Sequence, residues 1–229
     1  MNERHPLTCA VIVAAGQSRR MGIPKILYSI QNKTVIERCL ENFESSKYID
    51  SIVIVTSPQH LDEIKKFATS KVIAIGLGGQ TRQDSVKNAL RLLPNDCAFI
   101  AIHDAARPFT SPDLIDTVCK AACRYGAAAP VIPVTSTVKQ INADGNISST
   151  IDRDQLRLVQ TPQVFKLDEY VELLNSAITS GYDLTDDCQL WEMQGKTVYS
   201  VDGCFDNIKL TTPDDLVIAD FIAQRMDES

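Results

Sequence analysis

Short β-branched apolar runs alternate with helical patterns over the first two-thirds of this chain of 229 residues. Parallel strands need a crossover connection, so this alternation predicts βαβ units and an α/β fold with a mostly parallel sheet flanked by helices. The predicted strands are 9–14, 51–56, 71–75, 98–103 and 127–134. The predicted helices between them are about 34–43, 58–68, 82–92 and 111–125.

The pattern changes at about 137–160, where alternating residues on both sides of the turn Asn142-Ala143-Asp144-Gly145 predict a projecting β-hairpin arm. An isolated hairpin is only marginally stable, so we expect the arm to pack against a second subunit and form a homodimer. Without a linker or an internal repeat, residues 1–229 are predicted to be a single domain that carries this arm. The later predicted elements are helices at about 166–180, 185–194 and 213–225 and a strand at 196–201.

Composition and charge argue against nucleic acid and membranes as partners. The net charge is −6 without a basic tail, which is unlike a nucleic-acid-binding surface. The 44% hydrophobic content is that of an ordinary soluble protein, and no apolar segment approaches the length of a transmembrane helix. Seven cysteines without a Cys-x-x-Cys pair predict reduced thiols and a cytoplasmic protein.

The segment 14–25 directly follows the first predicted strand and combines small residues with cations. Gly16 lets backbone amides approach a ligand closely, and Arg19, Arg20 and Lys25 supply positive charge. Such a loop at the carboxyl end of a strand suits a polyphosphate. It contains neither the P-loop signature nor G-x-G-x-x-G, which disfavours a dinucleotide enzyme that transfers hydride. The alternative is a solvated basic turn.

Two further loops, 76–82 and 103–109, end at the same predicted sheet edge, where ligands of such sheets bind. Asp104 follows a buried strand and is placed to hold a hard divalent cation, or alternatively to cap the next turn. Glycines in the first of these loops permit close approach to a base or ribose. Asp206 and Lys209 follow in a later polar cluster, which is either a phosphate and metal site or a surface ion pair.

Together, these segments resemble one family along essentially the whole chain: the 2-C-methyl-D-erythritol 4-phosphate cytidylyltransferases of the non-mevalonate isoprenoid pathway. The resemblance implies a Rossmann-like nucleotidyltransferase fold, a homodimer joined through the arm, and Mg²⁺-dependent transfer of CMP from CTP to 2-C-methyl-D-erythritol 4-phosphate. The products would be 4-diphosphocytidyl-2-C-methyl-D-erythritol and pyrophosphate. The matching motifs are A-A-G-x-x-x-R-M-x-x-x-K at 14–25, G-G-x-x-R-x-D-S-V at 78–86, H-D-A-A-R-P at 103–108, V-x-x-T-x-K at 134–139, D-R at 152–153, T-P-Q-x-F at 161–165, T-D-D at 185–187 and D-N-I-K-x-T at 206–211.

The same resemblance implies roles for individual residues, and several residues carry two roles. The catalytic positions are Arg20, Lys25, Arg153 and Lys209, the first two of which stabilise the transition state. The positions that bind CTP are Ala14, Ala15, Gly16, Gly79, Gln80, Ser85 and Ala105. The acceptor positions are Asp104, Arg107, Thr137, Arg153, Thr161 and Lys209, of which Thr137 and Arg153 come from the partner's arm. The metal positions are Asp104 and Asp206. Gln80 departs from relatives that carry an acidic residue there.

Two alternatives share the same fold. One is a ribitol-5-phosphate cytidylyltransferase, and Ala106 disfavours it because that relative tends to carry a bulkier residue there. The other is a nucleotide-binding regulator without catalytic activity. A regulator would not need the complete transfer apparatus of Arg20, Lys25, Asp104 and Lys209.

Overall fold

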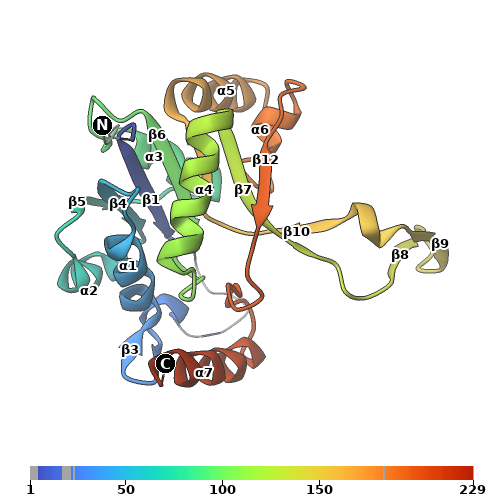
Figure 1. Ribbon diagram of the computed structural model, residues 1–229, viewed down its shortest axis with the longest axis horizontal. Helices are drawn as coiled ribbons and strands as arrows, with labels where there is room; N and C mark the ends of the chain where they lie inside the picture. Colours follow the sequence, from blue (N-terminus) through green and yellow to red (C-terminus); the bar gives the residue numbers. More distant parts are fainter. Residues whose placement is uncertain (1–4, 17–21, 23, 183, 229) are drawn as a thin grey trace.

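The computed structural model describes residues 5–16, 22, 24–182 and 184–228, and among these eight strands form one central sheet. The order across the sheet is β10-β7-β11-β6-β1-β4-β5, and β12 also pairs with β7 (Figure 1). The strands are β1 (Thr8–Ala14), β4 (Ser51–Thr56), β5 (Val72–Leu77), β6 (Phe99–Asp104), β7 (Ala127–Pro133), β10 (Arg157–Val159), β11 (Gln163–Lys166) and β12 (Tyr199–Asp202).

The predicted α/β class with a mostly parallel sheet is confirmed. β1 pairs in parallel with β4 and β6, β4 with β5, and β7 with β12. The sequence did not predict β11, which is antiparallel to both of its neighbours β6 and β7, or β10, which is antiparallel to β7. β10 and β11 have three and four residues and follow the arm without an α-helix between them, so neither periodicity nor the alternation of strands with helices marks them. Because β11 is antiparallel, its first residue lies at the edge of the sheet where β6 ends.

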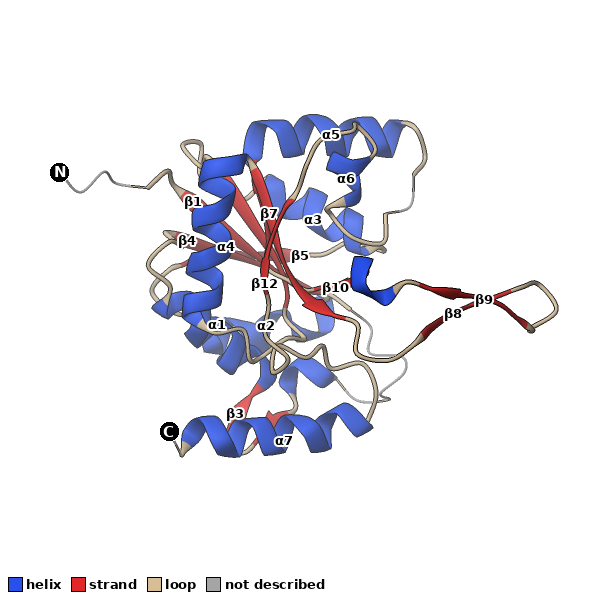
Figure 2. Ribbon diagram, turned by 45° about the vertical axis from the view of Figure 1, so that its right-hand side comes forward, coloured by secondary structure: helices blue, strands red, loops and turns tan. Residues whose placement is uncertain are grey.

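The helices form a layer on each face of the sheet, as Figure 2 shows for α4 on one side and α3 on the other. Ile12, Ile52 and Ile54 belong to the core on the side of α1, α2 and α4, whereas the alternate positions Val11 and Val53 pack on the side of α3, α5 and α6. This is the two-residue period of a strand buried on both faces. The helices are α1 (Val35–Ser45), α2 (Leu61–Ile64), α3 (Arg82–Leu90), α4 (Pro112–Tyr125), α5 (Leu167–Thr179) and α6 (Gln189–Glu192).

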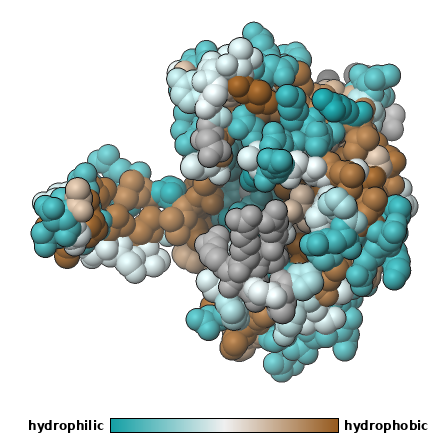
Figure 3. All heavy atoms as spheres, turned by 180° about the vertical axis from the view of Figure 1, so that it is seen from behind, coloured by the Kyte–Doolittle hydropathy of each residue, from teal (hydrophilic) through white to brown (hydrophobic). Residues whose placement is uncertain are grey.

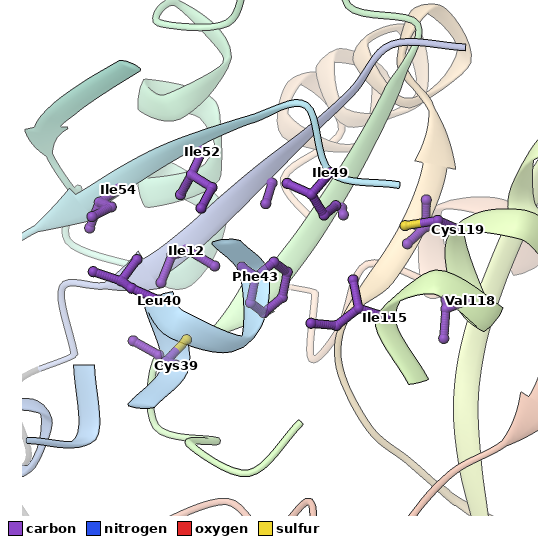
Figure 4. Close-up of a cluster of buried hydrophobic side chains, with 14 of the residues drawn as sticks. Ile12, Cys39, Leu40, Phe43, Ile49, Ile52, Ile54, Ile115, Val118 and Cys119 are labelled. Atoms are coloured by element: carbon purple, nitrogen blue, oxygen red, sulfur yellow. The ribbon is translucent and has the colours of Figure 1, made fainter. Parts of the chain in front are cut away.

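Figure 4 shows the first of these cores, where Ile12, Ile52 and Ile54 point from the sheet toward Leu40 and Phe43 of α1. All five side chains are fully buried. Each buried aliphatic or aromatic side chain contributes roughly 1.5–3 kcal/mol. This packing holds the carboxyl ends of the strands in fixed positions.

Two predicted helices are shorter or more broken than expected. The segment 58–68 is three pieces: a 3-10 turn at Pro58–His60, α2, and a second 3-10 turn at Lys65–Phe67. The expected helix at 185–194 is reduced to α6, because the backbone amides of Asp187 and Gln189 donate to the side chains of Gln163 and Asp186 and not to carbonyls of a preceding helical turn. The remaining short elements are 3-10 turns at Lys25–Leu27 and Arg153–Gln155 and a hairpin of β2 (Ser29–Ile30) with β3 (Lys33–Thr34).

The C-terminal helix α7 (Asp214–Asp227) forms a smaller apolar cluster with the β2–β3 hairpin. Its end is held to α1 by an ion pair, in which the Arg38 Nη2 atom lies 2.8 Å from the Asp227 Oδ2 atom. Within the described ranges, no helix has the length and hydrophobicity needed to cross a bilayer.

The predicted arm is present as the antiparallel hairpin of β8 (Val138–Ile141) and β9 (Ile147–Ile151), which extends away from the body (Figure 1). Gly145 has a φ of 83°, which the turn needs and which favours glycine. Ile141 and Ile147 are 54% and 66% exposed. Figure 3 shows hydrophobic atoms along the arm.

We expect Ile54→Ala to lower the free energy of unfolding by about 2–5 kcal/mol, because it leaves a cavity in the core. Ile73→Ala, on the neighbouring strand, is the matched control. Ile73 is 51% exposed, so its loss should be under about 1 kcal/mol. Urea unfolding followed by circular dichroism measures both, and equal losses would contradict the packing described here.

Candidate active site

Three loops meet at the carboxyl ends of β1, β5 and β6 and line one cavity of about 240 Å³. Gly78 lies directly against the Ala15 side chain, where any Cβ atom would collide, and a Cβ atom on Gly79 would collide with Asp84. Both positions therefore require glycine for close packing of the loops. The Ser85 hydroxyl accepts a hydrogen bond from the Gly79 amide at 3.0 Å and donates one to the Thr81 carbonyl at 2.8 Å.

Helix α3 begins at this cavity. Its N-cap residue Thr81 accepts a hydrogen bond from the Asp84 amide at 3.0 Å, and the Asp84 carboxylate accepts one from the Thr81 amide at 3.2 Å. This capping box fixes the loop from Gly79 to Thr81 against the helix. The cavity wall formed by these residues is therefore preorganised without a ligand.

The Asp104 carboxylate, at the end of β6, lies between two cations. Its Oδ1 atom is 3.1 Å from the Arg82 Nε atom, and its Oδ2 atom is 2.6 Å from the Lys209 Nζ atom. Burial alone would raise the pKa of Asp104, but Arg82 and Lys209 outweigh it and hold this pKa well below its ordinary value. Asp104 is therefore ionised at neutral pH.

A second cavity, of about 130 Å³, adjoins the first, and Arg82, Asp104 and Lys209 line both. Arg107 and Thr161 line only the second. Arg107 donates from Nη1 to the Asn207 carbonyl at 2.7 Å, and its buried Nε atom has no hydrogen-bond partner within the described part of the chain.

Arg82 is held in place by Asp187, and Asp187 in turn by Tyr170. Both residues are buried, and neither was predicted as a site residue. Its Nη1 atom donates to the Asp187 Oδ2 atom at 2.6 Å, and the Tyr170 hydroxyl donates to the Asp187 Oδ1 atom at 2.6 Å. Burial lowers the pKa of Arg82, but the Asp187 and Asp104 carboxylates outweigh it and raise this pKa above its ordinary value. The T-D-D motif was the only sequence signal for Asp187, and Tyr170 had none.

His103 is fully buried beside the cluster and binds no charged group directly. Its Nε2 atom lies 3.1 Å from the Arg107 carbonyl, which only accepts, so Nε2 carries the proton. The Nδ1 atom then accepts from the Thr161 hydroxyl at 2.9 Å, and that oxygen accepts from the Asp104 amide at 3.2 Å. Burial lowers the pKa of His103 to about 4, so the ring is neutral and fixes Thr161 beside Asp104.

Asn207, also fully buried, joins the D-N-I-K motif to the rest of the site. Its side-chain oxygen accepts from the Thr110 hydroxyl at 2.6 Å, and its side-chain nitrogen donates to the Thr161 carbonyl at 3.0 Å. These bonds hold the backbone that carries Lys209 next to β6. Asn207 was part of the D-N-I-K motif in the sequence, but no role in the site was predicted for it.

The predicted nucleotide-binding residues lie largely together. Lys25 lines the first cavity and donates to the Leu210 carbonyl at 3.0 Å. Ala105 is fully buried and is not among the described lining residues, where its neighbour Ala106 appears instead. Arg20 lies outside the described residues. The other predicted lining residues all border the first cavity: Ala14, Ala15, Gly16, Gly79, Gln80 and Ser85.

Three predicted residues lie away from both cavities in this single subunit. Asp206 forms an ion pair with Arg225 of α7 and does not contribute to the described linings. Thr137 and Arg153 belong to the arm and are exposed, and Arg153 donates to the Thr135 carbonyl. The predicted roles of all three stay predictions.

The donor set can be compared with the needs of a magnesium ion. Within the described ranges, no group of three or more His, Cys, Asp or Glu side chains could hold a metal ion by itself. Asp104 offers one ionised carboxylate at the junction of the cavities. Mg²⁺ is commonly held by one or two carboxylates together with substrate phosphates. The residues therefore fit a magnesium ion that arrives with a polyphosphate.

Comparisons with known proteins agree over nearly the whole chain. Residues 8–225 match the family model of 2-C-methyl-D-erythritol 4-phosphate cytidylyltransferase. The enzyme of that name from Caldanaerobacter subterraneus is 40% identical over 94% of this chain and 98% of its own. The solved 4-diphosphocytidyl-2C-methyl-D-erythritol synthase of Anaerococcus prevotii has a TM-score of 0.86 at 29% identity and covers 96% of each chain. The solved cytidylyltransferase of Thermus thermophilus has a TM-score of 0.78 at 31% identity, over 94% of this chain and 98% of that one.

We expect His103 to make the protein less stable in acid. The unfolded state takes up a proton near the ordinary pKa of 6.5, whereas the folded state resists until about 4, so stability falls as the pH drops between these values. The loss attributable to His103 is roughly 3 kcal/mol. Urea unfolding from pH 7 to pH 4 should show a shallower decline for His103→Asn than for wild type. His60→Asn, at a surface turn, is the control, and parallel declines for all three proteins would contradict the assignment.

Proposed function

Because the chain belongs to the 2-C-methyl-D-erythritol 4-phosphate cytidylyltransferase family, we propose that its two adjoining cavities hold the two substrates of that reaction. The protein is a nucleotidyltransferase that transfers CMP from CTP to 2-C-methyl-D-erythritol 4-phosphate. The products are 4-diphosphocytidyl-2-C-methyl-D-erythritol, an intermediate of isoprenoid precursor biosynthesis, and pyrophosphate. The observation that carries the proposal is that Arg82, Asp104 and Lys209 border both cavities.

The first cavity is the nucleotide side. Its glycine loop at Gly78 and Gly79, together with Ser85, offers backbone close enough to contact a base and a ribose. The loop after β1 and Lys25 then face the triphosphate. Arg20 is assigned to the same loop by resemblance.

The second cavity is the acceptor side. Arg107 lines it with a guanidinium, and Thr161 lines it with a hydroxyl that donates its proton to His103 and so shapes the wall without offering a donor to a phosphate. Lys209 adds a cation at the boundary with the nucleotide side. The two cations, Arg107 and Lys209, suit the phosphate of a polyol phosphate.

The reaction is a displacement at the α-phosphorus of CTP. An oxygen of the acceptor phosphate forms the new bond to that phosphorus, and the bond to the pyrophosphate oxygen breaks. The acceptor phosphate is already ionised near neutral pH, so no general base is needed, and the task is to bring two anions together. A cation about 4 Å from a phosphate oxygen gains roughly 4 kcal/mol at an effective dielectric constant near 20. Lys25 and Lys209 line the first cavity and would supply that stabilisation.

The metal proposed for this site is Mg²⁺, and Asp104 is the residue that would hold it. When bound, Mg²⁺ neutralises charge on the phosphates of the nucleotide. In the present structure the Asp104 carboxylate is neutralised by Arg82 and Lys209 instead. The proposed contribution of Asp206 requires that it exchange its ion pair with Arg225 for the metal.

The proposed assembly is a homodimer joined through the arms. Ile141 and Ile147 of the hairpin and Leu158 of β10 are each more than half exposed and offer apolar surface to a partner. In the dimer, Thr137 and Arg153 would reach the acceptor side of the other subunit. The proposed location is the cytoplasm, in keeping with seven free cysteines.

The reaction is tested by pyrophosphate release with each of the four common nucleoside triphosphates and two acceptors. Turnover should occur with CTP and 2-C-methyl-D-erythritol 4-phosphate, be lost on chelation with EDTA and return with added Mg²⁺. Faster turnover with D-ribitol 5-phosphate would favour the related cytidylyltransferase. Tight binding of CTP without turnover of either acceptor would favour a regulator.

A mixing experiment tests the shared site. Lys25→Ala and Arg153→Ala should each be nearly inactive, because each removes a cation from every site of its homodimer. If Arg153 acts in the site of the partner, each mixed dimer has one intact site, and an equal mixture should recover about a quarter of wild-type activity. Subunit exchange is verified by native mass spectrometry. Exchange without recovery would show that the two residues act in the same subunit.

A further inference from the structure

We propose that Arg82 is a further cation of the acceptor-phosphate site, and that Asp187 and Tyr170 are positioning residues that hold its guanidinium in place. We call Asp187 and Tyr170 the supporting pair. The inference rests on the proposed function, since it names a substrate contact within that site. The group recognised is the dianionic phosphate of the acceptor.

Arg82 lies where the two substrates have to meet, because it lines both cavities. A guanidinium carries five N–H donors in one plane. The Nε atom donates to Asp104 and the Nη1 atom to Asp187. No partner of the Nη2 atom is found among residues 5–16, 22, 24–182 and 184–228, so a planar pair of donors remains for phosphate oxygens.

Hydrogen bonds and core packing hold both residues of the supporting pair in place. Asp187 is 3% exposed, and its two oxygens are used by Arg82 and by the Tyr170 hydroxyl, while its amide donates to the Gln163 side chain at 3.0 Å. Tyr170 is fully buried, with its ring against Phe165 at a centroid distance of 5.4 Å. The hydroxyl position is therefore set by core packing, and through Asp187 it sets the position of Arg82.

Lys209, the other cation bound to Asp104, is held less firmly than Arg82. Lys209 reaches Asp104 at 2.6 Å, but its side chain is 41% exposed on a flexible stem. Arg82 is 25% exposed and held by two carboxylates. When a phosphate enters, Lys209 is able to change partner, whereas Arg82 stays a preorganised charge. The neighbouring acidic side chain, Asp186, is engaged by the Gln163 amide at 3.2 Å.

Tyr170→Phe is the decisive variant, because it removes only the hydroxyl that holds Asp187. We expect the KM for 2-C-methyl-D-erythritol 4-phosphate to rise about tenfold, as for a misplaced binding group, while the KM for CTP changes less than about twofold. Trp191→Phe is the matched control. Trp191 stacks on Phe165 at a centroid distance of 4.6 Å and lies 6.3 Å from the Tyr170 ring, so its substitution tests packing in the same cluster while the Tyr170 hydroxyl stays in place.

A double-variant cycle shows whether Tyr170 acts through Arg82. In an Arg82→Lys background, Tyr170→Phe should add less than about a twofold change, because the planar donors are already lost. Calorimetry gives a readout apart from turnover: acceptor phosphate is titrated into enzyme loaded with a CTP analogue whose α–β bridge is a methylene group. Binding should weaken in Tyr170→Phe and remain unchanged in Trp191→Phe.

Three results would overturn the inference while wild type turns over normally: equal losses in Tyr170→Phe and Trp191→Phe, a full effect of Tyr170→Phe in the Arg82→Lys background, or an increase in the KM for CTP alone. Thermal unfolding of each variant separates lost stability from lost positioning. If wild type itself releases no pyrophosphate with CTP and the acceptor, the proposed function fails instead.

Discussion

A single buried carboxylate organises the edge of the sheet where the substrates meet. Asp104 ends the central strand β6, and the cations that neutralise it come from the start of α3 and from the chain before α7. Leaving the Asp104 carboxylate buried without its partners would cost several kcal/mol. The end of β6, the start of α3 and the segment that carries Lys209 are therefore held in one arrangement by electrostatics as well as by the packing of the sheet.

Around this charged cluster lies a layer of neutral hydrogen bonds. His103, Thr161 and Asn207 connect the loop after β6 with the segment entering β11 and with the backbone before Lys209. Each group is satisfied by a neutral partner, so the layer fixes positions without changing the net charge at the substrates. A charged cluster at the substrates, positioned by a neutral layer around it, suits a reaction whose main difficulty is to place two anions in contact.

The sequence predicted the parts of the fold that leave a repetitive pattern. Continuous β-branched runs such as 51–56 mark strands buried on both faces, and an aspartate after such a run predicts the position of Asp104 at the ligand edge. The strands β10 and β11 are too short for periodicity. Contacts such as Arg82 with Asp187, which are 105 residues apart, depend on the sheet order, which local patterns do not encode. In the sequence, Tyr170 looks like any other core residue of α5, because only its hydrogen bond to Asp187 in the folded chain distinguishes it.

The antiparallel direction of β11 has a consequence for how this chain tolerates changes of length. The chain returns from the arm through β10 and reaches Thr161 only two residues after that strand ends, before it enters β11 beside β6. Both strands have a fixed register, so an insertion or deletion between them would displace Thr161 from His103 and Asp104. The turn at Asn142–Gly145 lies on exposed chain, and the hydrogen bonds of its Asn142 side chain run within the turn itself. Natural length variation among homologues is therefore expected at the tip of the arm and not at its root.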